Sequence, residues 1–254
     1  MKLKPEEELV CGINAVSQII KTRPSSVHSL YINRSNNERL NVLVRDATEN
    51  KIEIIKERSS FFEDNFEGVN HQNAAIICNK RSEESEQFLD PILNKDEVKI
   101  LILEGLTDPH NLGACLRSAA GVDIDAVIVP KNRSCHLTPT VRKISCGASE
   151  LIPFVVVTNI VRTINKLQEK GVSVYGSDLQ ANQSYENVNY SSKYALVIGS
   201  EDKGIRRLTR ENCDELIKID MSEKMDSLNA SVSTGILLFE ISRQIKLTET
   251  NIVK

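Results

Sequence analysis

The chain has 254 residues, a formal net charge of −3 at pH 7, 40% hydrophobic residues and 26% charged residues. These values exclude a collagen-like, a disordered or a membrane-embedded protein and fit one large or two modest globular domains. No apolar run approaches the roughly 18 residues that a membrane helix needs. The first ten residues, MKLKPEEELV, lack the apolar core of a signal peptide. We therefore expect a cytoplasmic protein with no membrane partner.

The six cysteines predict neither disulfides nor a metal site. None of them forms a C-x-x-C pair, and several lie within apolar segments. Such cysteines are typical of reduced, mostly buried thiols. We expect no bound metal.

Taken in chain order, the first elements are short and mixed. Residues 11–22 and 37–50 have helical patterns, and residues 28–33, 51–57 and 73–78 have strand patterns. We expect residues 1–78 to form a small α/β domain. Residues 79–97 are polar and charged and contain Pro91, which predicts a flexible linker with no more than one helical turn.

From residue 98 onward, apolar strands alternate regularly with helices. The strand patterns are KILILEG, AVIVP, FVVVT, SVYGSD, YALVIGS and ELIKID. One helical segment, NIVRTINKLQEKG, stops at Gly171, a residue favoured at helix ends. Near-continuous apolar strands separated by helices predict an α/β domain with a buried parallel sheet over residues 98–254.

Three of these strands are followed by segments rich in glycine and small polar residues, each of which opens a helix. The segments are EGLTDPHNLGACLRSA (104–119), VIGSEDKGIRRL (197–208) and IDMSEKMDSLNASVSTG (219–235). Ligands of open parallel sheets bind beyond the carboxyl ends of the strands. The sequence therefore predicts a binding site where these three segments meet.

Individual residues in these segments have simple structural interpretations. Asn111 can cap the first helix and Ser227 the last one, and Arg117 can form an ion pair. Asn229 is a poor helix former, so capping explains it less well. In the last helix, apolar residues at helical spacing predict one buried face; they are Leu228, Val232, Ile236 and Phe239.

Several common kinds of site are excluded by missing motifs. The chain has no G-x-G-x-x-G and no G-x-x-x-x-G-K-[ST] sequence, so a dinucleotide-binding oxidoreductase and a P-loop enzyme are disfavoured. No serine lies on a nucleophile elbow, and the four histidines have unrelated contexts. What is left is a backbone-lined pocket with Asn, Arg, Glu and Ser side chains at its mouth.

The net charge conceals two basic patches. Residues 59–97 hold nine acidic and three basic residues, so the remainder carries +3. One patch contains Lys131 and Arg133, and the other contains Arg206 and Arg207. Such patches can contact phosphates, although charge alone favours a merely solvated surface.

Three segments resemble the three successive motifs of the SpoU/TrmH family: DPHNLGACLRSA, LVIGSEDKGIRRLTRENCDELIKIDM and DSLNASVSTGILLFEISRQ. The members of this family are S-adenosylmethionine-dependent RNA 2′-O-ribose methyltransferases of the SPOUT superfamily. The resemblance covers nearly the whole chain. The segments CGINAV, HQNAAI and KISCGASELIPFVVVTNIVRTINKLQEKG resemble the branch that methylates a guanosine in the peptidyl-transferase loop of bacterial 23S rRNA. It implies a trefoil-knotted α/β catalytic domain, an N-terminal L30e-like domain that binds RNA, and a homodimer with its active site at the subunit interface.

The resemblance also implies roles for particular residues. The expected catalytic residues are Asn111, Arg117, Glu201, Ser227 and Asn229. The cofactor S-adenosylmethionine is expected at Val197, Ile198, Gly199, Ile219, Asp220, Met221 and Leu228. RNA phosphates are expected at Lys131, Arg133, Arg206 and Arg207.

Two roles are open for Arg117. The resemblance implies a general base helped by a substrate phosphate. A guanidinium has a pKa above about 12 and resists deprotonation, which favours phosphate binding or stabilisation of the developing oxyanion instead. Three positions depart from the family pattern: Cys11 replaces His, and Asn73 and Asp202 replace Gly.

We therefore predict methyl transfer from S-adenosylmethionine to a guanosine of 23S rRNA. The alternatives are the same transfer to tRNA or to an rRNA adenosine, and a non-catalytic RNA-binding protein of ribosome assembly. Binding of S-adenosylmethionine separates the last alternative from the others.

Overall fold

The computed structural model describes residues 3–33, 37–66, 70–222, 224–225 and 227–252, with side chains as far as residue 248. The chain divides into two compact units. The smaller unit comprises residues 1–82 and 146–151, and the larger unit comprises residues 83–145 and 152–254. None of the described helices is both long enough and apolar enough to span a membrane.

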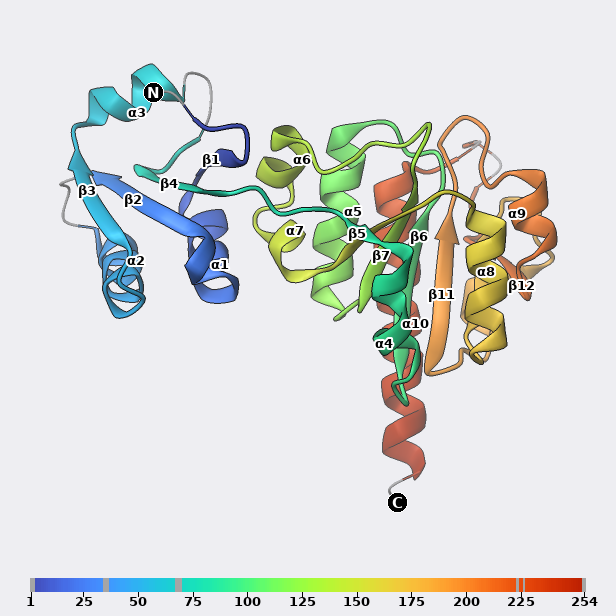
Figure 1. Ribbon diagram of the computed structural model, residues 1–254. Coiled ribbons are helices and arrows are strands. Elements are labelled where there is room, and N and C mark those ends of the chain that lie inside the picture. The colour runs from blue at the N-terminus through green and yellow to red at the C-terminus, as the bar shows by residue number, and fades with distance from the viewer. Residues whose placement is uncertain (1–2, 34–36, 67–69, 223, 226, 253–254) are drawn as a thin grey trace. The chain divides into compact units, whose positions relative to one another are not determined.

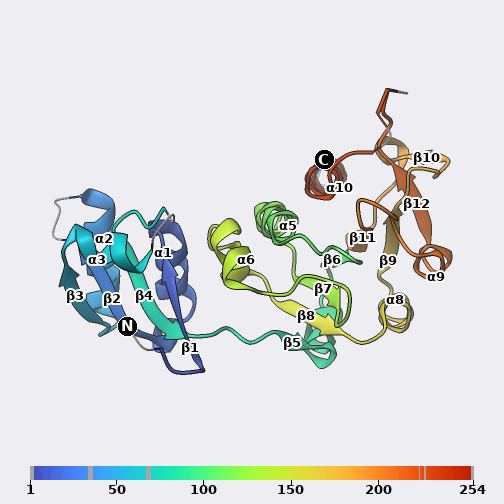
Figure 2. The same ribbon diagram turned by 90° about the horizontal axis from the view of Figure 1, so that it is seen from above.

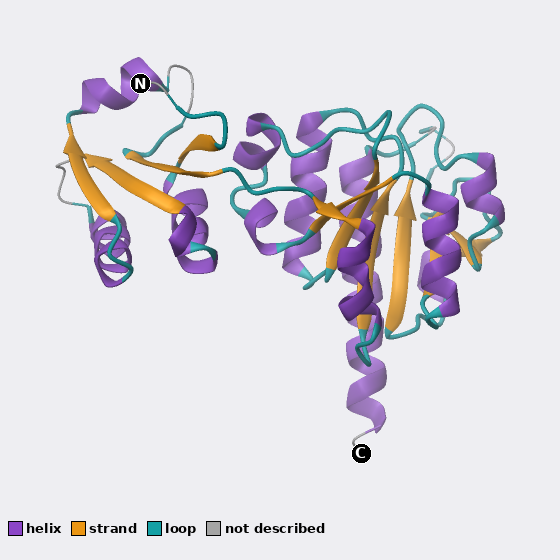
Figure 3. Ribbon diagram, viewed as in Figure 1, coloured by secondary structure: helices purple, strands orange, loops and turns teal. Residues whose placement is uncertain are grey.

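The smaller unit is a four-stranded mixed sheet with helices (Figures 1 and 3). Its sheet has the order β1-β4-β2-β3, in which β2 and β3 are parallel and the other pairs are antiparallel. Its elements are β1 (Glu7–Cys11), α1 (Ile13–Thr22), η1 (Pro24–Ser26), β2 (Val27–Asn33), α2 (Glu38–Glu49), β3 (Glu53–Glu57), α3 (Ser59–Asn65), β4 (Ala74–Asn79) and α7 (Ala148–Leu151). The expected helices and strands are confirmed here, whereas β1, α3 and α7 were not predicted.

The larger unit contains an eight-stranded sheet in which every pair is parallel, as expected. The strand order is β10-β12-β9-β11-β6-β7-β8-β5. The strands are β5 (Glu84–Ser85), β6 (Val98–Leu103), β7 (Ala126–Pro130), β8 (Phe154–Val157), β9 (Ser173–Ser177), β10 (Gln183–Ser184), β11 (Lys193–Ile198) and β12 (Glu215–Lys218). The chain winds outward in opposite directions from β6 and β11, so a crevice opens at their carboxyl ends.

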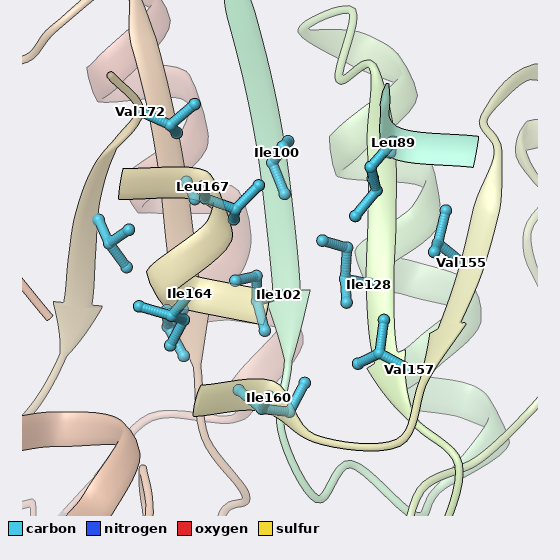
Figure 4. Close-up of a cluster of buried hydrophobic side chains, with 14 of the residues drawn as sticks. Leu89, Ile100, Ile102, Ile128, Val155, Val157, Ile160, Ile164, Leu167 and Val172 are labelled. Atoms are coloured by element: carbon cyan, nitrogen blue, oxygen red, sulfur yellow. The ribbon is translucent and has the colours of Figure 1, made fainter. Parts of the chain in front are cut away.

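Helices cover both faces of this sheet, with α5, α6 and α10 on one side and α8 on the other (Figure 2). The helices are η2 (Glu86–Phe88), α4 (Leu89–Leu93), α5 (Pro109–Gly121), α6 (Pro139–Ile144), α8 (Ile160–Glu169), η3 (Tyr185–Asn187), α9 (Arg207–Glu211) and α10 (Ala230–Ile252). Gly171 has φ +79° just after α8, which confirms the predicted helix stop. Apolar side chains from α4 and α8, such as Leu89 and Ile164, fill the core against strand residues such as Ile128 of β7 (Figure 4).

The segment predicted as a flexible linker is largely ordered. Residues 84–93 form β5, η2 and α4, and β5 pairs with β8. Leu89 and Leu93 are buried in the core of the larger unit. The polar composition misled the prediction because a few apolar residues are enough to fix so short a helix to a core.

A short segment returns to the smaller unit from the middle of the larger one. Residues 146–151 contain α7 and pack with residues 1–82. The Arg23 guanidinium donates from Nε to Oε2 of Glu150 at 2.8 Å, and Arg81 donates to the carbonyl of Ser149 at 2.8 Å. A Cβ at Gly147, where φ is +95°, would lie 2.9 Å from the Gln18 side chain. Nothing in the local sequence predicted this return.

The buried face of α10 differs from the predicted one. Val232 and Phe239 are 49% and 54% exposed, while Leu237, Leu238 and Ile241 are fully buried. The helix has apolar residues on two faces, and periodicity cannot tell which of them meets the core. A stripe of exposed apolar side chains consequently runs along α10.

Candidate functional site

Three of the five predicted catalytic residues are joined by hydrogen bonds at the carboxyl edge of the sheet. Asn111 Nδ2 donates to Glu201 Oε1 at 2.9 Å, and Asn229 Nδ2 donates to the same oxygen at 2.6 Å. Asn229 Nδ2 also lies 2.9 Å from Asn111 Oδ1. The three residues come from segments that are 28 to 118 positions apart in the sequence. Their convergence confirms that the three strand ends meet.

The two asparagines are held by helix starts. Asp108, not Asn111, caps α5, because its carboxylate accepts from the backbone amides of His110 and Asn111. The prediction of Asn111 as the cap was therefore wrong, and its side chain is free to bond Glu201. Asn229, not Ser227, caps α10, since its Oδ1 accepts from Ser231 N at 2.9 Å, so the prediction of Ser227 as this cap was also wrong.

Glu201 is carried by a tight loop after β11. Ser200 and Gly204 exchange backbone hydrogen bonds of 3.2 and 2.8 Å across this loop. A Cβ at Gly199 would lie 2.0 Å from the carbonyl carbon of Gly204, so only glycine fits there. Asp202, which departs from the family pattern, is exposed and does not have a positive φ, so it imposes no backbone strain.

A first cavity of about 290 Å³ lies on one side of this loop. Of the predicted cofactor residues, Ile198, Gly199 and Leu228 line it, together with Glu201 and Ser227. Its volume is near the lower end of the range for small-molecule sites. Its lining combines apolar side chains such as Leu228 and Ile205 with polar and charged ones such as Ser227 and Asp178. Such a mixture suits a ligand with both an apolar and a charged part.

The other four predicted cofactor residues lie outside the lining of the first cavity. Ile219 and Met221 line a smaller adjoining cavity, which shares Leu228 with the first. Val197 is fully buried in the core, so only its backbone is available. Asp220 lines neither cavity, and its carboxylate lies 3.7 Å from Lys218 Nζ.

A second cavity of about 300 Å³ lies on the other side of the loop. Asn111 and Glu201 line it, and so do two of the predicted RNA-binding residues, Arg133 and Arg206. Glu201 therefore borders both cavities. The arrangement places the Glu201 carboxylate between the first cavity and a second cavity that Arg133 and Arg206 line.

Arg117 lies apart from this cluster. It is exposed, it lines neither cavity, and it has no hydrogen bond or ion pair with the described part of the chain. Asn111 and Arg117 are six residues apart, which turns their side chains about 120° from each other around the helix axis. The structure thus does not bring Arg117 to the other predicted catalytic residues of its own chain.

The inward face of α5 contrasts with the face that bears Arg117. Cys115 is fully buried, and its Sγ lies 3.4 Å from Thr234 Oγ1 of α10. Burial raises the pKa of the Cys115 thiol to about 11, so the sulfur stays protonated near neutral pH.

The remaining predicted RNA-binding residues are both exposed. Arg207 Nη1 forms a 2.7 Å ion pair with Glu211 in the same short helix. Lys131 lies just after β7, and it has no side-chain partner in the part of the chain that the structure describes.

The structure adds site residues that were not predicted. Ser177, Asp178 and Leu179 follow β9 and line the first cavity. Asp178 Oδ2 pairs with Arg210 Nη1, also at the cavity, at 3.2 Å. These residues end a parallel strand beside β11, so the strand-end rule could have found them.

In the smaller unit, one of the two departures from the family pattern has a structural explanation. Asn73 has φ +57°, a conformation that glycine adopts freely and that asparagine tolerates better than most residues. Next to it, Gln72 Oε1 accepts from the backbone amide of Ile13 at 3.0 Å, just after Gly12, whose φ is +96°. Cys11 is half-buried as the last residue of β1. No cluster of three or more His, Cys, Asp or Glu side chains suited to a metal occurs among the described residues.

Comparison with known proteins agrees with this geometry. Residues 99–239 match the model of the SpoU rRNA Methylase family, and residues 9–84 match the model described as "RNA 2'-O ribose methyltransferase substrate binding". Over 240 residues the chain is 41% identical to the 23S rRNA (guanosine-2'-O-)-methyltransferase RlmB of Pseudomonas putida, covering 93% of this chain and 96% of that protein. The RlmB of Escherichia coli K12 is 39% identical over 239 residues, covering 93% and 98%.

A solved structure supports the fold. The SpoU methyltransferase AviRb from Streptomyces viridochromogenes, crystallised with AdoMet, superposes with a TM-score of 0.77 at 21% identity. The superposition covers 94% of this chain and 90% of that one. With the matched family model and the relatives near 40% identity, these findings show that the chain belongs to the SpoU rRNA methylase family.

Proposed function

We propose that the protein transfers a methyl group from S-adenosylmethionine to the ribose 2′-oxygen of a guanosine in the peptidyl-transferase loop of 23S rRNA. The observation that carries the proposal is the Asn111–Glu201–Asn229 network between the two cavities. The names of the two RlmB relatives support the choice of substrate. Because these relatives are bacterial proteins named for acting on ribosomal RNA, we also propose that this protein works in the cytoplasm.

The first cavity fits the cofactor. Ile198 and Gly199 offer backbone groups, Leu228 offers an apolar wall, and Ser227 offers a hydroxyl. When bound, S-adenosylmethionine supplies a methyl group on a positively charged sulfur, which is already a strong electrophile. The protein's own task is therefore to align the ribose hydroxyl and to lower the cost of its negative charge.

Glu201 is arranged to orient that hydroxyl. Its Oε1 accepts from both asparagine amides and, at 3.2 Å, from the backbone amide of Ala230. Three donors to one oxygen hold the carboxylate in one direction. The second oxygen has no partner among the described residues and can accept the hydroxyl of a ribose entering the second cavity.

The second cavity fits the substrate backbone. Arg133 and Arg206 line it and bring positive charge beside Asn111 and Glu201. Guanidinium groups bind phosphate oxygens in paired hydrogen bonds. We assign these two residues, and more peripherally Lys131 and Arg207, to RNA phosphates, and we assign the smaller unit, as an L30e-like domain, to RNA docking.

A second copy of the chain completes the site. Arg117 points away from the cluster in its own chain, and beside it α5 packs on α10, whose exposed face carries Val232 and Phe239. The Phe239 ring reaches α5, because a Cβ at Gly121 would lie 3.2 Å from it. Burying this stripe in a homodimer would bring Arg117 toward the partner's site, where it would bind the substrate phosphate or stabilise the developing oxyanion.

Methyl transfer from labelled S-adenosylmethionine tests the proposal. Unmodified 23S rRNA and tRNA are incubated with the protein and with the Glu201→Gln variant, and the labelled nucleoside is identified. Label in one 2′-O-methylguanosine of 23S rRNA, lost in the variant, is the expected result. Label in tRNA or in an adenosine would contradict the proposed 23S rRNA guanosine substrate. Absence of both label and cofactor binding would indicate a non-catalytic RNA-binding protein.

A further inference from the structure

The loop of residues 199–205 separates the two cavities and carries Glu201. Its shape therefore sets both the cofactor pocket and the direction of the carboxylate. We propose that Glu104, the residue directly after β6, is the positioning residue that holds both ends of this loop. The inference deepens the proposed function and depends on it for its kinetic part.

Glu104 holds the start of the loop through its backbone. Its amide donates to the carbonyl of Ile198 at 2.8 Å, which extends the pairing of β6 with β11 by one bond. The next residue, Gly105, packs on the first residues of the loop, since a Cβ there would lie 3.6 Å from Ser200 Cβ. The backbone of β6 thus fixes the point where the chain leaves β11.

Glu104 holds the end of the loop through its side chain. Oε2 accepts from the backbone amide of Arg206 at 3.0 Å, and Oε1 accepts from Thr209 Oγ1 at 2.9 Å. Arg206 Nε lies 3.9 Å from Oε1. One residue therefore joins the entry and the exit of a loop that is also closed by the Ser200–Gly204 pairing and by a 3.3 Å hydrogen bond from Lys203 N to Ser200 Oγ.

The Glu104 carboxylate that accepts the hydrogen bonds from Arg206 and Thr209 is buried, so water cannot readily replace these donors. Glu104 and Thr209 are each only 2% exposed. A buried carboxylate must keep its hydrogen-bond donors, and water cannot take their place when the site is closed to solvent. Loss of an acceptor here is therefore expected to move Arg206 and the loop before it.

If Glu104 served only the stability of the fold, its loss would not affect cofactor binding specifically. Asp125 provides a matched control for this alternative. Asp125 lies beside the other end of β6, where its carboxylate accepts from the backbone amide of Lys99 at 2.9 Å and from Lys95 Nζ at 2.5 Å. Asp125 thus also fixes a backbone amide of β6, but at the amino end of that strand, far from both cavities. Stability should depend on both carboxylates, and cofactor binding only on Glu104.

The test measures S-adenosylmethionine affinity by calorimetry without RNA, kcat on 23S rRNA, and thermal stability. For Glu104→Gln we expect an affinity loss of about fivefold and a kcat loss of about tenfold, because small misplacements of reacting groups are costly. Thr209→Val should act in the same direction with about a threefold loss in each, and Thr209→Ser should restore both. Asp125→Asn should change affinity and kcat less than twofold at a similar loss of stability.

Two outcomes would overturn the inference. One is that Glu104→Gln and Thr209→Val, both folded, bind and turn over like the parent protein. The other is that Asp125→Asn loses as much S-adenosylmethionine affinity as Glu104→Gln at equal stability. The loss would then follow from general destabilisation and not from the position of Glu104. If the parent protein methylates no RNA, the proposed function fails, but the affinity measurements still decide the role of Glu104.

Discussion

The two faces of α5 present opposite situations. On the inward side, Asn111 and Cys115 find their partners within the chain, in Glu201 and in Thr234. On the outward side, Arg117 is exposed and has no partner among the described residues. This difference supports the proposal that folding builds the inward half of the site and that association with a second copy supplies Arg117. The comparison therefore teaches where the proposed dimer can be tested.

The largest expected effect tests this division directly. Arg117→Ala and Asn111→Ala should each reduce methyl transfer by about a hundredfold or more. If Arg117 serves the partner's site, co-refolding the two inactive variants forms mixed dimers that have one intact site. Since half of the dimers are then mixed, about a quarter of the parent activity should return.

One further mixture provides the control. Asn111→Ala mixed with Glu201→Gln should recover nothing, because both changes lie in the same half of the site. Absence of recovery in the first mixture as well would place Arg117 in the site of its own chain and would contradict the comparison.

A smaller effect should follow from changing the apolar stripe on α10. Phe239→Asp places a charge where we expect a dimer interface, so it should halve the mass measured by light scattering at micromolar concentrations. The side chain is 54% exposed, so the fold of each chain should survive. Val42→Asp, an equally drastic change at a 38% exposed position on α2, serves as the control and should leave the mass unchanged. A Phe239→Asp protein of full mass would contradict the interface.

The basic residues extend the contrast between paired and unpaired charges. Arg133 has no partner among the described residues, whereas Arg207 is paired with Glu211. Neutralising Arg133 should reduce the salt dependence of RNA binding by about one counterion, and neutralising Arg207 by clearly less. Binding titrations of Arg133→Gln and Arg207→Gln across a range of salt concentrations measure the slopes. Equal slopes would show that the ion pair opens when RNA binds.

The smallest effect concerns the inward face of α5. The pKa of Cys115 is about 11 in the folded protein, above the value of about 8.5 for a free thiol. The unfolded chain therefore loses this proton first as the pH rises, and the free energy of unfolding should fall from about pH 8.5 toward pH 11. Urea unfolding should show a smaller fall for Cys115→Ala than for the parent protein. An identical fall would indicate that the thiol is accessible to hydroxide in the folded state.

Sequence patterns predicted the repetitive parts of the structure well. Apolar strands alternating with helices predicted the parallel sheet, and the strand-end rule predicted where Glu201 and Asn229 meet. The capping residue of α5 was assigned wrongly, although Pro109 at the first helical position marks Asp108 as the cap. That error was avoidable from the sequence.

Other features depend on contacts that no local pattern encodes. The exposed face of α10 also carries large apolar side chains, Val232 and Phe239, so only the position of the sheet decides which face is buried. The two-residue strands β5 and β10 are too short to show a period. Arg117 lies outside the cluster because of helix geometry, and the proposal that it serves a partner's site depends on contacts beyond a single chain.

The return of residues 146–151 to the smaller unit has a practical consequence for dissecting the protein. A fragment that stops at residue 82 lacks α7, and Arg23 then loses its bond to Glu150 while remaining partly enclosed. Grafting the N-terminal residues onto another enzyme would transplant an unfinished domain. The smaller unit is thus contiguous in space but not in the sequence, so any exchange of this unit between relatives must carry two separate stretches of sequence together.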